Sequence, residues 1–371
     1  MASYEVDNES KLLGIKIGGF LKVSQVKQMR KRNPAKLILL CILLAISAFL
    51  GGGFAYFQYE FTSAIKHGDV SFQDMQVDAA TLYDKDIINI LLIGADSREE
   101  WNDSGRSDSS MIATLDMKNG QLKLTSLMRD MYIEIPGHGK NRFNAAYKFG
   151  GVSLLNETIA HNFNIRLDGY VVVDFKAFRD VIDALGGVDI TLTEKEANYL
   201  NEAYHGKIQV EVGEQTLTGK EALAYTRIRQ VATATGKLND FGRTERQRTV
   251  IDSLFSKFKT QSLGEITDIL KMVLENVTTD LSNKQISSLA FSVLTISDKE
   301  SKQMCVPMEG SYDSLEVVLP GTTTEAKVLE VDIEANKAGL ENFIFHKYEE
   351  PSTEEGSNET AQIESDTTME E

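Results

Sequence analysis

The fold is decided by residues 87–94, Ile-Ile-Asn-Ile-Leu-Leu-Ile-Gly, an apolar run that ends at a glycine. A short apolar run bounded by a turn residue is typical of a buried strand. Downstream, residues 111–117 and 121–127 alternate apolar and polar side chains around Lys118-Asn119-Gly120. Because Asn-Gly favours the tight turn of a hairpin, we predict that these two runs pair as antiparallel strands.

Helical patterns alternate with short strands in the rest of this region. We predict helices at 144–163, 175–185, 218–224 and 243–259, and strands at 169–173 and 188–192. The helix at 218–224 begins with a capping box, since Thr218 is followed three residues later by Glu221. Two more helical patterns lie within 263–296, and 300–346 is mixed. The alternation predicts an α/β domain with a mixed sheet.

The net charge of −16 is unevenly distributed along the chain. Residues 1–36 carry net +5 and residues 37–58 carry no charge, which leaves net −21 for the remainder. As a helix, the apolar stretch 37–57 would span about 30 Å, the thickness of a bilayer core. Basic residues directly before this stretch predict that the N-terminus is cytoplasmic. We therefore expect a single-pass protein of the cell membrane with its C-terminal domain outside the cell.

The alternatives for residues 37–57 are a buried core helix and a cleavable signal peptide. A core helix rarely runs this long without a polar face, and no clear Ala-x-Ala cleavage site follows. Cys41 lies in this stretch and Cys305 in the outer part, so the two cannot pair. An exterior domain without a disulfide needs a core large enough to be stable by itself.

Arginines and carboxylates gather at four places in the acidic outer part. The four groups are Asp96, Arg98, Arg106 and Asp108; Arg129 and Asp130; Arg227 and Arg229; and Arg243, Arg246 and Gln247. Each group by itself fits a solvated loop or a surface ion pair equally well. If residues 225–229 are extended, Tyr225, Arg227 and Arg229 point to one face.

The fourth group falls in the first turn of the predicted long helix, with Arg243 and Gln247 on one face. A cation there opposes the helix dipole, and a bound anion would resolve that conflict. Taken together, the four groups predict a site for a multiply charged anion, with Asp96 and Asp108 available for a metal. Mg²⁺ prefers one or two carboxylates plus phosphate oxygens, so the pattern favours phosphate or pyrophosphate chemistry.

Several other chemistries are excluded by missing motifs. The sequence has no H-E-x-x-H, P-loop, G-x-S-x-G or Cys/His cluster, and its five histidines are scattered. Nucleic-acid binding needs a basic surface, whereas the outer part carries net −21.

The chain resembles the LytR-CpsA-Psr family. Eight segments carry the resemblance, in family order from about Ile88 to about Phe258: NILLIGADSR, GRSDSSMIATLD, SLMRDMYIEIPG, RFNAAYKFGG, DGYVVVDFKAF, LGGVDITL, LTGKEALAYTRIR and DFGRTERQRTVI. Two features depart from the family pattern. Arg142 stands where the family often has lysine, and residues 230–239 form a long connection.

The resemblance implies an α/β/α domain with a prenyl-binding cavity. It also implies transfer of a glycopolymer, such as teichoic acid or capsule, from an undecaprenyl-pyrophosphate carrier to peptidoglycan, forming a phosphodiester. Asp96 and Asp108 resemble the ligands of Mg²⁺ (or Mn²⁺). The implied pyrophosphate contacts are Arg98, Arg106, Arg129, Arg227, Arg229, Arg243, Arg246 and Gln247. We assign catalysis to Arg106, Arg129 and Asp130, with Asp130 or a metal-ligand carboxylate as the general base.

The resulting organisation has six segments. We expect a basic cytoplasmic segment at 1–36, a transmembrane anchor at 37–58 and a stalk at 59–86. The LytR-CpsA-Psr catalytic domain follows at 87–260, then a C-terminal extension of the outer domain at 261–348 and an acidic disordered tail at 349–371. The expected partners are the lipid-linked glycopolymer, peptidoglycan and the membrane, and not nucleic acid. The alternatives are a prenyl-pyrophosphate phosphatase, a lipid-linked polymer scaffold without turnover, and a cell-envelope regulator of transcription.

Overall fold

The central sheet is built around β2 (Ile87–Ala95), the strand predicted from the apolar run 87–94. In the computed structural model, which describes residues 66–75, 81–95 and 107–349, β2 lies between β3 (Ser107–Asp116) and β7 (Gly169–Val173). It pairs antiparallel with β3 and parallel with β7. β3 in turn pairs antiparallel with β4 (Gln121–Leu127), which confirms the predicted hairpin.

Within the described residues the central sheet has seven strands, in the order β1-β10-β7-β2-β3-β4-β11. Its edge strands are β1 (Lys66–His67) and β11 (Lys302–Val306), and β10 (Val277–Thr279) lies between β1 and β7. β1 is parallel to β10 and β11 is parallel to β4, whereas β10 is antiparallel to β7. The sheet is therefore mixed, as predicted.

Two strands of the central sheet come from the expected C-terminal extension. β10 and β11 lie within residues 261–348 and both pair with strands of the expected catalytic domain. Because their backbones hydrogen-bond to β7 and β4, the segments before and after residue 260 share one sheet. Removing either strand would leave backbone groups of its neighbours unpaired, which costs free energy.

The described part of the expected stalk also belongs to the domain. Phe72 is buried, and its backbone N–H donates to Asp280 Oδ2 at 2.8 Å. Leu82 forms a bridge with Ile165, and β1 joins the sheet. These contacts hold the segment against the domain, so a free stalk does not describe residues 66–75 and 81–86.

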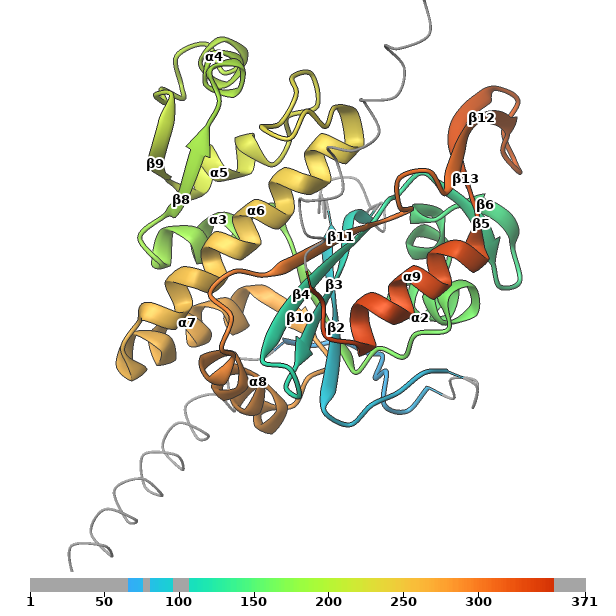
Figure 1. Cartoon of the computed structure of the whole chain (residues 1–371), viewed down its shortest axis with the longest axis horizontal. Helices are drawn as coiled ribbons and strands as arrows, with labels where there is room; N and C mark the ends of the chain where they lie inside the picture. The colour runs from blue at the N-terminus through green and yellow to red at the C-terminus, as the bar shows by residue number, and fades with distance from the viewer. Residues whose placement is uncertain (1–65, 76–80, 96–106, 350–371) are drawn as a thin grey trace, which may run out of the picture. The chain divides into compact units, whose positions relative to one another are not determined.

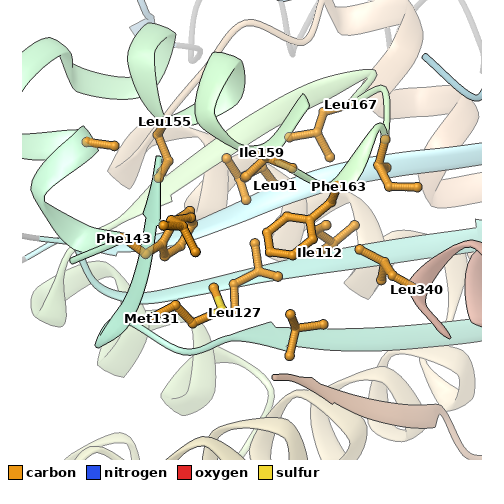
Figure 2. Close-up of a cluster of buried hydrophobic side chains, with 14 of the residues drawn as sticks. Leu91, Ile112, Leu127, Met131, Phe143, Leu155, Ile159, Phe163, Leu167 and Leu340 are labelled. Atoms are coloured by element: carbon orange, nitrogen blue, oxygen red, sulfur yellow. The ribbon is translucent and has the colours of Figure 1, made fainter. Parts of the chain in front are cut away.

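One face of the sheet is covered by α2 (Asn144–Phe163) and α9 (Ile333–Phe345). Figure 2 shows the core between the sheet and these helices, where strand residues Leu91, Ile112 and Leu127 pack against helix side chains. The helical contribution to this view is Leu155, Ile159, Phe163 and Leu340. Each fully buried side chain of this size stabilises the fold by about 1.5–3 kcal/mol.

The helix predicted at 144–163 has the expected limits, but it is not regular. Gly150 and Gly151 have non-helical backbone angles, with φ +62° at Gly151, so α2 is kinked there. A residue with a side chain rarely adopts that left-handed conformation.

The other face is covered by α3 (Phe175–Ala184), α6 (Asn239–Thr260), α7 (Leu263–Asn276) and α8 (Asn283–Thr295) (Figure 1). Successive strand residues point to opposite faces, so Ile90 packs towards α7 and α8 while Leu91 packs towards α2. Ile251 and Phe255 of α6 pack on β3 and β4. The architecture is thus three-layered, with helices on both faces of a mixed sheet.

Two smaller sheets complete the unit. β12 (Tyr312–Val318), β13 (Glu325–Val331), β5 (Met131–Ile135) and β6 (Gly139–Arg142) form one of them in that order. β8 (Val188–Leu192) and β9 (Gly213–Leu217) form the other, which packs with α4 (Glu194–Ala203) and α5 (Gly219–Tyr225) around a separate core. The predicted capping box of α5 is present, since Thr218 and Glu221 hydrogen-bond to each other's backbone N–H.

A buried ion pair links the hairpin to the end of the domain. Lys123 Nζ donates to Asp116 Oδ2 at 2.7 Å, and neither side chain is exposed. The same ammonium donates to the carbonyls of Ile344 and His346 at 3.0 and 2.7 Å. Burial lowers the pKa of Lys123, an effect that the Asp116 carboxylate only partly offsets. Burial works against the Asp116 carboxylate too, but hydrogen bonds from Asn119 and Lys123 outweigh it and lower the pKa of Asp116.

The expected membrane anchor, 37–58, lies outside the described residues, as do the basic segment 1–36 and residues 350–371 of the acidic tail. Among the helices of the described residues, none is long and apolar enough to cross a membrane.

Candidate active site

A cavity of about 520 Å³ lies between the sheet and the helices α3, α5 and α6. Much of its wall is apolar, from strand residues and from side chains of these three helices. The apolar contributors are Leu92, Met111, Val173, Phe178, Leu223 and Ile251. Such a wall suits a hydrocarbon chain, which gains free energy by leaving water.

The same cavity is lined by three arginines, Arg227, Arg229 and Arg243, and by Gln247. Arg243 and Gln247 are one turn apart on α6, so they face the cavity together. Gln247 Oε1 accepts a hydrogen bond from Ser109 Oγ of β3 at 2.9 Å, which fixes the amide. The structure therefore places three of the predicted pyrophosphate-binding arginines, and Gln247, in one cavity with an apolar wall.

The arginines are held together by one carboxylate, that of Asp240. Its Oδ1 lies 3.0 Å from Arg229 Nε and 3.3 Å from Arg243 Nη1. Its Oδ2 accepts from Arg129 Nη2 at 3.2 Å. Asp240 thus brings Arg129 to the group, although Arg129 itself does not line the cavity. Three guanidiniums would otherwise repel one another at low dielectric.

Sequence reasoning missed Asp240 as a functional residue and misplaced the helix start. α6 begins at Asn239, so Arg243 stands in the second turn rather than the first, and the first-turn residue is the acid Asp240. An anion in the first turn agrees with the helix dipole, so the proposed conflict between cation and dipole does not exist. An acid in the first helical turn, beside two arginines, was the available signal.

The protonation of Asp240 is set by opposing influences. Burial raises the pKa of the carboxyl, the guanidiniums of Arg129 and Arg229 lower it, and the neighbouring Asp130 carboxyl raises it again. The net direction is upward. A carboxylate with a raised pKa, next to cations, is able to take up a proton more readily than an ordinary aspartate.

Asp130 lies beside this group and contacts two guanidiniums. Its Oδ2 is 3.4 Å from Arg129 Nε and its Oδ1 is 3.5 Å from Arg142 Nε. Arg142 also donates from Nη2 to the carbonyl of Lys327 in β13, at 2.7 Å. A lysine would present a single ammonium instead of a planar fork, so it would not reproduce the geometry of these two contacts. The departure from the family pattern at Arg142 thus ties the small sheet to the arginine group.

The segment around Arg227 differs from the extended conformation considered above. Arg227 N–H donates to the Ala224 carbonyl at 3.1 Å and Ile228 N–H to the Tyr225 carbonyl at 3.2 Å, so the chain is turned. Tyr225 is buried in the core around α4 and α5, away from the cavity. Arg227 and Arg229 nevertheless both reach the cavity, and the guanidinium of Arg227 lies 4.0 Å from the ring centre of Phe175.

Arg246 does not fit the pyrophosphate role predicted for it. Its side chain is fully buried and pairs with Glu196 of α4, with Nε to Oε1 at 2.7 Å. Its other nitrogens donate to the carbonyls of Ile228 and Val231. Each of its three nitrogens donates to a group inside the protein, so Arg246 positions the turned segment that carries Arg229.

The remaining predicted residues fall in or beside the segment that separates β2 from β3 in the sequence. Asp96, Arg98 and Arg106 lie outside the described residues, and only the backbone of Asp108 is described. Ala95 pairs with Ser107 and Gly94 with Ser109, with a bulge between them. Asp96 follows Ala95 directly in sequence and Asp108 is the neighbour of Ser107, and Ala95 and Ser107 pair at one end of the two strands. Ser107 Oγ is buried there without a hydrogen-bond partner among the described residues.

Two carboxylates and a hydroxyl are oxygen ligands of the kind that Mg²⁺ prefers. Within the described ranges, no group of three His, Cys, Asp or Glu residues gathers to hold a metal.

Comparison with known proteins agrees with the fold. A family model, that of the LytR_cpsA_psr family, matches residues 54–333. The teichoic acid transferase TagU of Bacillus mycoides, named polyisoprenyl-teichoic acid–peptidoglycan teichoic acid transferase, is 35% identical over 260 residues, which are 68% of this chain and 81% of TagU. TagT of Bacillus subtilis carries the same activity name and is 32% identical over 272 residues, 71% of this chain and 83% of TagT.

Two solved structures of TagT extend the comparison. One, described as bound to LIIa-WTA, has a TM-score of 0.58 at 26% identity, and the match covers 74% of this chain and 99% of that one. The other holds an octaprenyl pyrophosphate lipid and has a TM-score of 0.55 at 25% identity, with the same coverage.

The molecule is an α/β/α protein with an apolar cavity that is lined by arginines. The match over residues 54–333 and the identity to TagU and TagT show the family. The chain belongs to the LytR-CpsA-Psr family.

Proposed function

We propose that this chain transfers a glycopolymer from an undecaprenyl-pyrophosphate carrier to peptidoglycan, where a phosphodiester forms. The observation that carries the proposal is the cavity, which combines an apolar wall with Arg227, Arg229 and Arg243. A prenyl pyrophosphate has the complementary chemistry, a hydrocarbon chain joined to a multiply charged head. The activity named for TagU and TagT, and the octaprenyl pyrophosphate held by one TagT structure, support the same substrate class.

The reaction is a phosphoryl transfer in which a sugar hydroxyl of peptidoglycan attacks the phosphorus that bears the polymer. A new phosphorus–oxygen bond forms, the bond to the bridging pyrophosphate oxygen breaks, and prenyl monophosphate leaves. The hydroxyl proton passes to a carboxylate, for which Asp130 and the adjacent Asp240 are the available groups. The energy comes from the pyrophosphate itself, so no ATP is needed outside the cell.

The arginines perform most of the catalytic work in this proposal. Arg229 and Arg243 lie close enough to share one carboxylate, so they can share the oxygens of one phosphate group. Guanidinium forks bind such oxygens bidentately and stabilise the charge that develops during transfer. Arg129 and Arg106 complete the predicted set, with Arg129 held in place through Asp240.

Mg²⁺ or Mn²⁺ is the proposed cofactor. Asp96 and Asp108 would hold it at the ends of β2 and β3, and when bound it would neutralise charge on the phosphate oxygens.

We also propose that residues 37–58 anchor the protein in the cell membrane, with the N-terminus cytoplasmic and the domain outside. The uncharged stretch and the basic residues before it support this topology. It would place the cavity on the side of the membrane where peptidoglycan lies, within reach of a lipid-linked donor.

The test uses the full chain in detergent, a lipid-linked teichoic acid donor with a radiolabelled polymer, and purified peptidoglycan. The expected result is label in the peptidoglycan fraction, joined by a phosphodiester, with release of prenyl monophosphate. Product formed equally without peptidoglycan would identify a phosphatase that uses water. Tight donor binding without product in either case would identify a scaffold, and both outcomes would refute the transfer reaction.

A further inference from the structure

A second cavity, of about 910 Å³, lies along another face of α6. Phe241, Glu245 and Arg248 line it, at spacings of four and three residues that place them on one side of the helix. The residues of α6 that line the first cavity, 243, 247 and 251, are spaced by four and turn to a different side. One helix thus forms a wall of both cavities.

The second cavity contains a buried cation that has no ion-pair partner among the described residues. Arg248 is 7% exposed, and its Nη1 donates to Ser126 Oγ at 2.7 Å while its Nε donates to Gln303 Oε1 at 3.2 Å. Both partners are neutral. Within residues 66–75, 81–95 and 107–349, no acid forms an ion pair with Arg248. A buried charge without a counter-charge is costly, so the site is complementary to an anion.

Two carboxylates line this cavity, and neither forms an ion pair with Arg248. Glu309 pairs with Lys237, and Glu245 accepts hydrogen bonds from Thr235. Cys305 is the remaining acidic group beside Arg248. Burial raises the pKa of its thiol more than Arg248 lowers it, so the thiol stays neutral at physiological pH.

The rest of the wall suits a sugar and a peptide. The rings of Phe241 and Tyr312 stack with centroids 5.3 Å apart, and Tyr348 also lines the cavity. The side-chain amides of Gln303 and Asn342 lie at its exposed margin. Aromatic faces pack against the C–H groups of sugar rings, and amides donate to and accept from hydroxyls and peptide groups.

The cavity is also correctly placed for an acceptor. Phe241 of its wall directly follows Asp240, the residue that holds Arg129, Arg229 and Arg243. Only the first turn of α6 separates the second cavity from the arginines that would hold the reacting phosphate.

We propose that the second cavity binds the acceptor, a muramyl-peptide unit of peptidoglycan, with a carboxylate of its stem peptide paired to Arg248. The identity of this acceptor rests on the proposed function. The glycan part lies against Phe241 and Tyr312, which directs a sugar hydroxyl towards the phosphate at the arginines.

The experiment is a calorimetric titration of the full chain in detergent with N-acetylmuramyl-L-alanyl-D-isoglutamine. The matched probe is the same molecule with its free carboxylate converted to an amide. The acid is expected to bind, and the amide to bind at least about tenfold more weakly, because it cannot form the charge-assisted pair with Arg248. Equal binding of the two probes, or binding of neither, would overturn the proposal.

A variant supplies the missing carboxylate from within the protein. Gln303→Glu places an acid at the partner of Arg248 Nε on an exposed position, so folding is preserved. It should weaken binding of the muramyl peptide by about tenfold or more, since the internal carboxylate competes with that of the ligand. Ser314→Glu, at an exposed position of β12, adds the same charge elsewhere and should leave binding unchanged. Undiminished binding to Gln303→Glu would contradict the assignment to Arg248.

Titration of the same samples with octaprenyl pyrophosphate separates this proposal from the proposed function. Octaprenyl pyrophosphate should bind the unaltered chain and Gln303→Glu alike. If it binds and the muramyl peptide does not, the acceptor site is wrong and the donor site stands. If the muramyl peptide binds with the expected dependence on Arg248 and octaprenyl pyrophosphate does not, the transfer reaction fails and the second cavity remains a carboxylate site.

Discussion

Arg129, just after β4, donates to Asp240 in the first turn of α6, with Nη2 and Oδ2 3.2 Å apart across 111 positions of sequence. The same carboxylate also contacts Arg229 and Arg243, so it gathers cations from three separate segments. This arrangement keeps the guanidiniums close together before any substrate arrives. Binding then costs less, because the charged groups are already positioned.

Replacing Asp240 should expose the repulsion that it offsets. Asp240→Ala is expected to destabilise the fold by about 1–3 kcal/mol, because charged partners lose their acceptor. Added inorganic pyrophosphate should stabilise this variant more than it stabilises the unaltered chain, as measured by thermal melting of the full chain in detergent. Asp313→Asn, an exposed change of the same charge, is the control. Equal stabilisation of variant and unaltered chain would show that the arginines are not the pyrophosphate site.

Arginine geometry should matter more than arginine charge. Arg229→Lys and Arg243→Lys are each expected to weaken octaprenyl pyrophosphate binding on the order of tenfold, since an ammonium cannot form the two parallel hydrogen bonds of a guanidinium. Arg179→Lys, on an exposed part of α3, should bind as the unaltered chain does. Titration calorimetry measures all three. Full affinity in both cavity variants would mean that only net charge is recognised.

Metal removal should stop turnover without unfolding the domain. Chelation with EDTA, Asp96→Ala and Asp108→Ala are each expected to abolish transfer, because phosphate oxygens would lose their neutralising cation. Restoring Mg²⁺ should recover activity after EDTA but not in the two variants. Circular dichroism provides the check on folding. Full activity of both variants at saturating Mg²⁺ would contradict the assignment of these ligands.

The buried pair of Lys123 and Asp116 should be a large contributor to stability. Lys123→Met leaves Asp116 without its cation and two carbonyls without a donor, and is expected to cost about 3–5 kcal/mol. Adding Asp116→Asn should recover part of that loss, as measured by chemical denaturation. Lys176→Met breaks an exposed pair with Asp180 and should cost no more than about 0.5 kcal/mol. Similar losses for the two lysines would show that burial of the first pair is not decisive.

Asp168 should make the fold less stable as pH rises. Burial raises the pKa of its carboxyl, an effect that the Asn89 N–H, at 2.9 Å, and Arg166 only partly oppose. The folded state therefore binds the proton more tightly than the unfolded state. Its stabilising contribution is complete below the ordinary pKa of 3.8 and is lost as pH rises through the raised value in the folded state.

Asp168→Asn should consequently be more stable than the unaltered chain at neutral pH, because a neutral amide can still accept from Asn89 without burying a charge. The difference should vanish in melts recorded below pH 3.8, where the carboxyl is neutral in both states. A variant that is less stable at neutral pH would show that the charged form is favoured.

Elements with a strong local signal were predictable from the sequence. The apolar run of β2 and the Asn-Gly turn between β3 and β4 need only neighbouring residues to be interpreted, and α2 shows the expected limits apart from its kink at two glycines. β10 was not predictable, because three residues carry too little pattern and its partner β7 lies about a hundred positions away. Pairing of distant segments is decided by the tertiary fold, not by local preference.

The site shows the same division. Spacing on a helix correctly grouped Arg243 with Gln247, which both line the first cavity. Spacing could not reveal that Arg246, one residue before Gln247, turns to Glu196 instead. That partner lies fifty positions earlier, in a helix whose packing is set by a separate core. Asp240 was overlooked for a related reason, since an acid at a helix start is common for dipole reasons alone.

The position of α6 between the two cavities has a thermodynamic consequence. A rigid helix that forms a wall of both sites allows a ligand in one to alter affinity in the other, and any such coupling free energy is the same in both directions. If a bound prenyl pyrophosphate draws Arg229 and Arg243 away from Asp240, the first turn of α6 responds, and with it Phe241 in the second cavity. By reciprocity, a muramyl peptide seated at Phe241 would then tighten or loosen the hold on the donor by the same factor. The free energy of forming the ternary complex would therefore be the same whichever substrate binds first.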